Sequence, residues 1–174
     1  MDEKPCERTE RWYREHVDAA YRLAHRVTGD AQDAADVVQA AFADILVNEH
    51  APRSAEAERS WLMGVIWNHS MLFKRGAGRR RRRERVVMEQ PRRLAPDPIE
   101  SIEQGEQRDR IRACLDSLAP RDRAVLHMHY CEGLTQREIA AAMGARQGTV
   151  GSWISRASKR LETVMRRAGL AAGL

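Results

Sequence analysis

The sequence predicts an all-α protein made of two small helical domains joined by a flexible linker, the C-terminal one a helix-turn-helix. Three observations support this fold class. Apolar residues recur at helical spacing through most of the 174 residues. Aromatic residues make up only 5% of the chain, and runs that alternate in the manner of strands are absent. Residues 89–99 contain three prolines and no helical period, which marks the domain boundary.

Composition favours a polyanionic partner for this chain. The net charge is +5 and the pI is near 9.5. No apolar run approaches the ~20 residues that a membrane-spanning helix needs, and the charged N-terminus does not resemble a secretory signal. We therefore expect a cytoplasmic protein without membrane insertion. Cys6, Cys114 and Cys131 are odd in number and scattered, which argues against a disulfide framework.

Two helices are predicted before residue 47. The first runs from about residue 8 to residue 28, with an inner side listed in order as Tyr13, Val17, Ala20, Leu23, Ala24 and Val27. Gly29 ends it and Asp30 caps the second helix, whose buried stripe is Ala34, Val38, Ala41, Phe42 and Ile45. The opposite side carries Asp33 and Asp36. This acidic side is either an ordinary solvated face or a docking face for a basic partner.

A third helix is predicted to begin near Ser60. Its expected inner side is Leu62, Val65, Ile66, His69, Leu72 and Phe73. That spacing turns Trp67 and Met71 outward, beside Lys74 and Arg75. An exposed Trp next to cations can stack on the bases of a single strand, although packing against a neighbouring helix is an equal alternative. The basic run over residues 74–85 adds affinity for phosphates.

The C-terminal segment over residues 134–161 predicts a helix-turn-helix. Thr135 and Glu138 have the spacing of a capping box, and Gly144 supplies the left-handed residue that ends the first helix. A second apolar series follows at Val150, Ile154, Ala157 and Leu161. The side opposite this series is small, polar and basic, which suits the DNA major groove. A helical hairpin with a solvated outer face is the alternative.

Catalytic and metal-binding patterns are absent from the sequence. Of the alternating residues His127, His129 and Cys131, only His127 and Cys131 could share a helix face, too few for a zinc site. We predict packing roles for them. No phosphate-binding glycine loop or nucleophile elbow occurs. The chain is therefore expected to be no enzyme and to need no cofactor.

Two blocks of the sequence resemble the extracytoplasmic-function sigma factors, the smallest members of the bacterial sigma-70 family. Residues 21–42 (YRLAHRVTGDAQDAADVVQAAF) with 61–70 (WLMGVIWNHS) are similar to domain two of that family. Residues 118–161, which contain the predicted helix-turn-helix, are similar to its domain four. The resemblance implies domain two over residues 8–88, a linker over 89–104 and domain four over 105–168.

The resemblance also implies partners and contact residues. The expected partners are core RNA polymerase (through the beta-prime clamp helices and the beta flap), promoter DNA and an anti-sigma factor. Polymerase contact is implied for Asp33, Asp36 and Gln39. Contact with the minus-ten element is implied for Trp67, Asn68, Met71, Lys74 and Arg75. Contact with the minus-thirty-five element is implied for Gln147, Thr149, Ser152, Ser155, Arg156 and Lys159.

The family also implies no catalysis of its own, since the polymerase performs the chemistry. A stand-alone helix-turn-helix regulator is the alternative function, but it would need a dimer interface and would bind an operator unaided. A nucleic-acid enzyme is a weaker alternative, because the sequence lacks clustered carboxylates or metal ligands.

Overall fold

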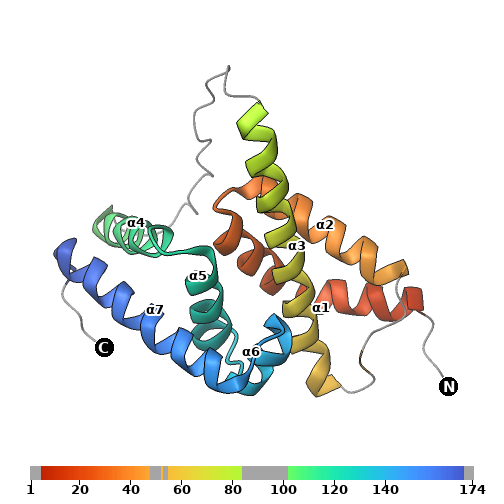
Figure 1. The fold of residues 1–174 in the computed structure, drawn as a ribbon. Helices are drawn as coiled ribbons and strands as arrows, with labels where there is room; N and C mark the ends of the chain where they lie inside the picture. Colours follow the sequence, from red (N-terminus) through yellow and green to blue (C-terminus); the bar gives the residue numbers. More distant parts are fainter. Residues whose placement is uncertain (1–4, 48–51, 53–54, 84–101, 171–174) are drawn as a thin grey trace.

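The computed structural model describes residues 5–47, 52, 55–83 and 102–170, and these residues form helices and turns without a strand. The all-α fold class is thereby confirmed (Figure 1). The predicted linker over residues 89–104 lies outside the described residues, except that Ile102 begins the next helix. None of the helices in the described ranges is both long enough and apolar enough to cross a membrane.

The N-terminal half consists of α1 (Pro5–Thr28), α2 (Ala31–Val47) and α3 (Ala55–Arg83), which pack against one another. Gly29 has a φ of 83° and lets the chain turn between α1 and α2. As predicted, Asp30 caps α2. Its Oδ1 accepts the backbone N–H groups of Gln32 at 2.8 Å and Asp33 at 2.9 Å, which would otherwise lack partners at the helix start.

The buried stripe of α2 agrees with the prediction, whereas that of α1 is rotated by one residue at its start. The predicted core residues of α2 are all buried, together with Val37. In α1, however, Trp12 is 1% exposed and Tyr13, predicted inward, is 48% exposed. Trp12 packs against Trp61 of α3 with ring centroids 5.5 Å apart, and this larger side chain takes the central position.

The predicted orientation of α3 is partly wrong. Leu72, expected inward, is 60% exposed, whereas Trp67, expected outward, is only 8% exposed. The buried side of α3 instead runs through Leu62, Met63, Ile66, Trp67 and Ser70. The reason is that α3 packs against helices on two sides, α1 and α2 on one and α6 (Gln136–Met143) on the other. A helix buried on two sides has no single apolar stripe to read from spacing.

The C-terminal half consists of α4 (Ile102–Asp116), α5 (Pro120–Leu126), a π-helical turn (His127–Cys131), α6 and α7 (Gln147–Arg167). Pro120 begins α5, where its missing N–H has no cost. Glu132 donates its N–H to the carbonyl of His127 at 3.1 Å, five residues back, which makes this turn wider than an α-helical one. This wider turn places His127 inside and Cys131 on the surface, so these two side chains do not share a face.

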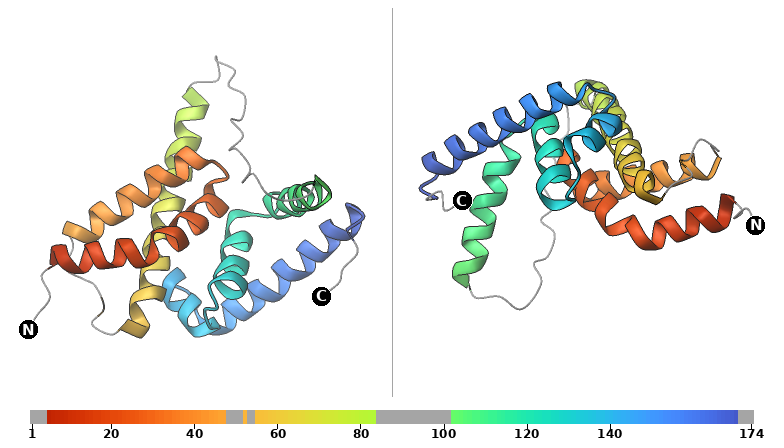
Figure 2. Two further views of the ribbon diagram at one scale, coloured as in Figure 1. Left: turned by 180° about the vertical axis from the view of Figure 1, so that it is seen from behind. Right: turned by 90° about the horizontal axis from the view of Figure 1, so that it is seen from below.

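The two halves pack against each other, which the sequence did not indicate. Helix α3 lies along α6, and α1 contacts α5 and the π-helical turn (Figures 1 and 2). Arg123 of α5 is 6% exposed and donates to the carbonyl oxygen of Val27, at the end of α1, at 3.3 Å. The halves therefore pack against each other through α3 with α6 and through α1 with α5.

His127 lies at this junction and is 5% exposed. Burial lowers the pKa of His127 to about 4, although the carboxylate of Glu132, 3.2 Å from its Nε2, acts in the opposite direction. Burial by itself would raise the pKa of Glu132, but the hydrogen bond from Arg59 and the charge of Arg22 outweigh burial, so the pKa lies below its ordinary value. His127 is therefore neutral at pH 7 beside a charged carboxylate.

Because folding lowers the pKa of His127 from 6.5 to about 4, the unfolded chain binds more protons between these values, and stability falls as the pH falls through this window. The free energy of unfolding should be about 2 kcal/mol smaller at pH 5 than at pH 7. Glu132 adds its own loss only below its ordinary pKa of 4.5. Denaturant unfolding at each pH checks this expectation. His127→Gln should flatten the dependence, and His129→Gln, the control in the same turn, should keep it.

Candidate nucleic-acid interface

Local capping fixes the start of the helix-turn-helix. The Thr135 hydroxyl accepts the N–H of Glu138 at 3.3 Å, and the Glu138 carboxylate accepts the N–H of Thr135 at 2.7 Å. These reciprocal bonds confirm the predicted capping box. They also hold the pKa of Glu138 below its ordinary value, chiefly through the hydrogen bonds from the Thr135 side chain and backbone. Gly144 ends α6 with a φ of 62°, as expected of a left-handed residue.

Helix α7 buries one side and presents the other to solvent. Val150 and Ala157 are 0% exposed and Ile154 is 7% exposed, and all three belong to the core. The exposed side carries all the residues for which the family resemblance implied contact with the minus-thirty-five element, namely Gln147, Thr149, Ser152, Ser155, Arg156 and Lys159. Helix packing thus brings together hydroxyls, an amide and cations over three turns, a surface that suits a groove lined with bases and phosphates.

Within this face, two side chains bond to the backbone of their own helix. Ser152 donates its hydroxyl to the carbonyl of Gly148 at 3.1 Å. Arg156 donates its Nε–H to the carbonyl of Ser152 at 3.1 Å. The Arg156 bond uses one N–H of the guanidinium and leaves the terminal nitrogens at the end of an exposed side chain.

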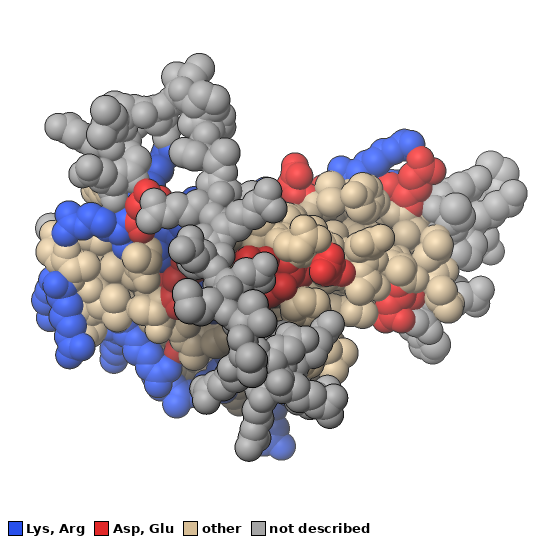
Figure 3. Space-filling view, turned by 90° about the horizontal axis from the view of Figure 1, so that it is seen from above, with Lys and Arg blue, Asp and Glu red and all other residues tan. Residues whose placement is uncertain are grey.

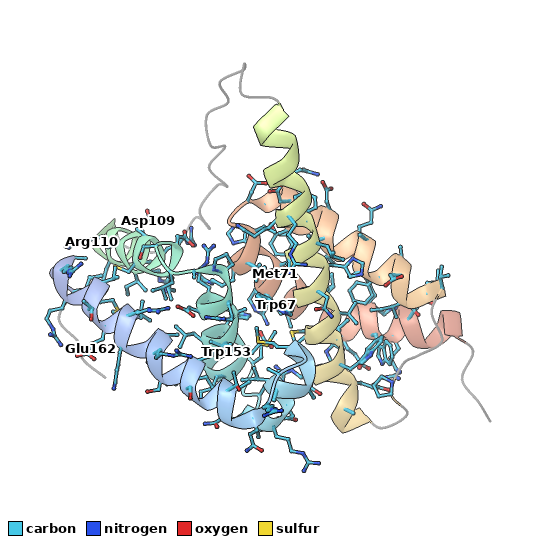
Figure 4. The ribbon with its side chains drawn as sticks, in the orientation of Figure 1. Trp67, Met71, Asp109, Arg110, Trp153 and Glu162 are labelled. Atoms are coloured by element: carbon cyan, nitrogen blue, oxygen red, sulfur yellow. The ribbon has the colours of Figure 1, made fainter. Side chains whose placement is uncertain are left out.

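Contacts with α5 hold α7 in position. Arg160 pairs with Asp122, whose side chain is 3% exposed. Trp153 lies on the side of α7 that faces α5 (Figure 4), and the guanidinium of Arg121 lies 4.7 Å from its ring centroid. Arg160 follows Trp153 by seven residues, so the ion pair and the cation–π contact lie on the same side of α7, about two turns apart, and both hold this side against α5. The exposed face is therefore presented by a rigid element.

One residue near this face escaped the sequence interpretation. A Cβ built on Gly151 would lie 2.8 Å from Oε1 of Gln136, so the Gln136 side chain lies over the position where Gly151 has none. Gln136 is exposed at the start of α6. An amide in this place can donate and accept at a base edge. The position of Gln136 beside the exposed face of α7 depends on the packing of α6 on α7, because Gln136 and Gly151 are distant in sequence.

Helix α2 carries the acidic face that the sequence predicted. Asp36 and Gln39 are exposed and Asp33 is partly exposed, on the side away from the buried stripe. Gln32 donates to the carboxylate of Asp36 at 3.2 Å. The helix contains no Lys, Arg or His. Figure 3 shows acidic side chains over the part of the molecule that holds α1 and α2, and basic side chains at the end that holds α4 and α7.

The residues that the sequence assigned to the minus-ten element divide into two groups on α3. Asn68 and Arg75 are exposed, and Lys74 is partly buried with its Nζ 3.4 Å from the carbonyl of Thr28. Trp67 is buried and Met71 partly buried, on the side of α3 toward α5 and α6 (Figure 4). The exposed stacking platform expected at Trp67 is thus absent from this arrangement, because the C-terminal half packs there.

Metal binding finds no support in the described part of the chain, where no three His, Cys, Asp or Glu side chains are grouped so that they could hold an ion. Cys114 is buried and Cys131 exposed, and both are free thiols.

Comparison with known proteins finds two matching families. "Sigma-70 region 2" matches residues 12–80, and "Sigma-70, region 4" matches residues 108–161. The chain is 33% identical over 156 residues to the ECF RNA polymerase sigma factor SigE of Mycolicibacterium smegmatis, covering 85% of this chain and 58% of that protein. It is 30% identical over 161 residues to the ECF RNA polymerase sigma factor SigL of Mycobacterium tuberculosis, covering 91% of this chain and 89% of that protein.

A solved structure shares the fold. The sigma factor RpoE of Bartonella quintana, determined in complex with the anti-sigma factor NepR, superposes with a TM-score of 0.68 at 18% identity. The match covers 90% of this chain and 96% of that chain.

The capping box gives a test of the helix-turn-helix. Thr135→Ala removes the side-chain bond to the N–H of Glu138 and should lower the free energy of unfolding by about 1 kcal/mol. Thr135→Ser keeps a hydroxyl at the same position and should restore most of the loss. Thermal or denaturant unfolding followed by circular dichroism measures both variants. Equal stability of the wild type and Thr135→Ala would show that the cap does not stabilise α6.

Proposed function

The chain belongs to the extracytoplasmic-function sigma factors of the sigma-70 family, and from this premise we propose that it binds core RNA polymerase and directs it to a particular subset of promoters. One observation carries the proposal. A single chain presents an acidic helix, α2, on its N-terminal half and an exposed polar and basic recognition face, α7, on its C-terminal half. In this function the protein is an initiation factor, and the polymerase performs the chemistry.

We assign the domains to the helices as follows. Domain two, residues 8–88, contains α1, α2 and α3, whereas domain four, residues 105–168, contains most of α4 and all of α5, α6 and α7. The linker over residues 89–104 connects them. Domain two supplies the contacts with the beta-prime clamp helices and the minus-ten element. Domain four supplies the contacts with the beta flap and the minus-thirty-five element. An anti-sigma protein is a further proposed partner, on the basis of family membership.

Charge supports the assignment of α2 to the polymerase. Asp33 and Asp36 lie on a side of α2 that the core does not use, and the sequence of α2 contains acidic residues but no Lys, Arg or His. Such a face attracts a basic helix over a distance of several ångströms and sets the orientation of docking. Gln39 continues the same exposed side by one turn and can hydrogen-bond to the partner.

The positions of the residues along α7 support base contacts for some of them and phosphate contacts for others in the minus-thirty-five element. Recognition helices concentrate base contacts near their N-terminal end. Thr149 and Ser152 lie there and can contact base edges, with Gln147 and Gln136 beside them. Arg156 and Lys159 lie one to two turns farther on and are placed for phosphates. Asn68, Met71, Lys74, Arg75 and Trp67 are the proposed contacts of α3 with the minus-ten element.

The function as a whole is tested by transcription in vitro. Core polymerase alone and core polymerase with this protein are given genomic DNA of the host, and the 5′ ends of the transcripts are mapped. The proposal expects new start sites that share sequence elements near minus ten and minus thirty-five. A protein that binds DNA without adding start sites would instead be a stand-alone regulator.

The polymerase contact is tested by charge reversal on α2. Asp33→Lys with Asp36→Lys should weaken binding to core polymerase by at least about tenfold, because a basic partner is then repelled. Asp18→Lys with Asp109→Lys changes the net charge equally at exposed positions of α1 and α4 and serves as the control. Binding is measured by fluorescence anisotropy of labelled protein. Equal weakening by both pairs would point to net charge instead of a docking face.

The role of Arg156 is tested by the salt dependence of promoter binding. A phosphate contact predicts that Arg156→Ala weakens binding uniformly across sequences and lowers the salt slope by about one. Ser152→Ala should instead change the preference at one base pair of the minus-thirty-five element. Arg166→Ala, an exposed residue in the last turn of α7, is the control. A loss by Arg156→Ala confined to one base pair, with an unchanged salt slope, would reassign Arg156 to base readout.

A further inference from the structure

The exposed face of α7 lacks a side chain at Gly151. Residues four apart on a helix form a row along its surface, because they differ by only about 40° around the axis. Gln147, Gly151 and Ser155 form such a row, and both Gln147 and Ser155 are exposed. Gly148 lies beside this row and has nothing within 4 Å of a Cβ built on it. In the middle of this face, α7 therefore has no side chain of its own to offer to DNA.

An amide from α6 lies over the position where Gly151 has no side chain. A Cβ built on Gly151 would lie 2.8 Å from Oε1, 3.5 Å from Cδ and 3.7 Å from Nε2 of Gln136. The whole amide group is thus in the place that a side chain at residue 151 would occupy. Because 2.8 Å is shorter than a carbon atom tolerates in a non-bonded contact, any residue other than glycine at position 151 would displace the amide.

The fold fixes the backbone from which this amide extends. Gln136 directly follows Thr135, whose capping box with Glu138 holds the start of α6. Farther along α6, Ile139 is 0% exposed and belongs to the same core as Val150 of α7. Helix α6 therefore lies beside the first turns of α7 (Figure 1). Only the side-chain torsions of Gln136 remain free to adjust to DNA.

The polar groups around Gly151 differ in what they can offer to a base. The Ser152 hydroxyl donates its hydrogen to the carbonyl of Gly148, so its oxygen remains as an acceptor. Arg156 offers donors alone. Gln136 is exposed, and its amide makes no hydrogen bond within the part of the chain that the structure describes. An amide has both an acceptor and donors, which is the combination that pairs with N6 and N7 of adenine in the major groove.

We propose that Gln136 reads an A·T base pair of the minus-thirty-five element from α6, and that Gly151 is the residue that admits its amide to the recognition face. The inference rests on the proposed function for the placement of α7 in the major groove. Two helices then share the reading of the sequence, with Thr149 and Ser152 from α7 and an amide from α6. A side chain at residue 151 and the Gln136 amide exclude each other, so the two positions act as a coupled pair.

The test uses the holoenzyme, formed from core polymerase and each variant. A promoter identified by the transcription experiment above is prepared with each base pair of its minus-thirty-five element replaced in turn by the other three. Initiation from competing templates gives the preference at every base pair. The wild-type protein should favour A·T at one position by at least about fivefold, which corresponds to the lower end of the discrimination given by a bidentate base contact.

Substitutions of Gln136 test whether its amide is the group that reads this position. Gln136→Ala should abolish the A·T preference there and leave the preferences at the other positions unchanged. Gln136→Glu keeps the length but loses the donors, and should shift the preference at that position from A to C, because a carboxylate accepts from N4 of cytosine. A residue that only supports the fold would not exchange one base for another. Gln107→Ala, which removes an exposed amide from α4, is the matched control and should keep every preference.

Substitution of Gly151 tests the coupling. Gly151→Ala places a methyl group where the amide lies and should remove the same A·T preference as Gln136→Ala. The double variant should lose no more than either single variant, because both changes act through one contact. Alanine favours a helix at both positions, and circular dichroism checks that each variant remains helical.

Three results would overturn the inference. One is an equal loss at every base pair in Gln136→Ala, which would indicate a phosphate contact. Another is a set of preferences that Gln136→Ala leaves unchanged. The third is a pair of losses at different base pairs that add in the double variant. Failure of the function is distinguishable from these results, because a wild-type holoenzyme that adds no start sites refutes the function and with it the premise of the inference.

Discussion

The close contact between Gly64 of α3 and the backbone of Ala142 in α6 is the constraint on which the packing of the two halves depends. A side chain on residue 64 would meet main-chain atoms, which cannot rotate away as a flexible side chain could. The closeness of α3 and α6 brings the end of the π-helical turn within reach of Arg59, and the carboxylate of Glu132 is buried there as a result. The same approach leaves no space for Trp67 to point into solvent. The close approach of α3 and α6 at Gly64 thus occurs in the same junction as the buried carboxylate of Glu132 and the buried ring of Trp67.

Charge is distributed so that the two proposed interactions do not compete. The acidic residues of α2 belong to the N-terminal half and the cations of α7 to the C-terminal half. A uniformly basic protein of this size would attract DNA over its whole surface. The net charge of +5 is a sum over the whole chain and does not show that acidic and basic residues lie on different helices. In the proposed function, the acidic residues attract a basic protein surface and the basic residues attract the nucleic-acid backbone.

The parts of the fold that could be predicted from the sequence are those with one buried side. Helix α2 and the helix-turn-helix each have a single apolar stripe, and Asp30, Thr135 and Gly144 mark their ends through bonds within a few residues. The exposed face of α7 could be predicted for the same reason. Helix α3 could not, because neighbours on two sides bury residues that spacing places outside. The π-helical turn and the position of Gln136 depend on contacts between distant segments, which periodicity does not encode.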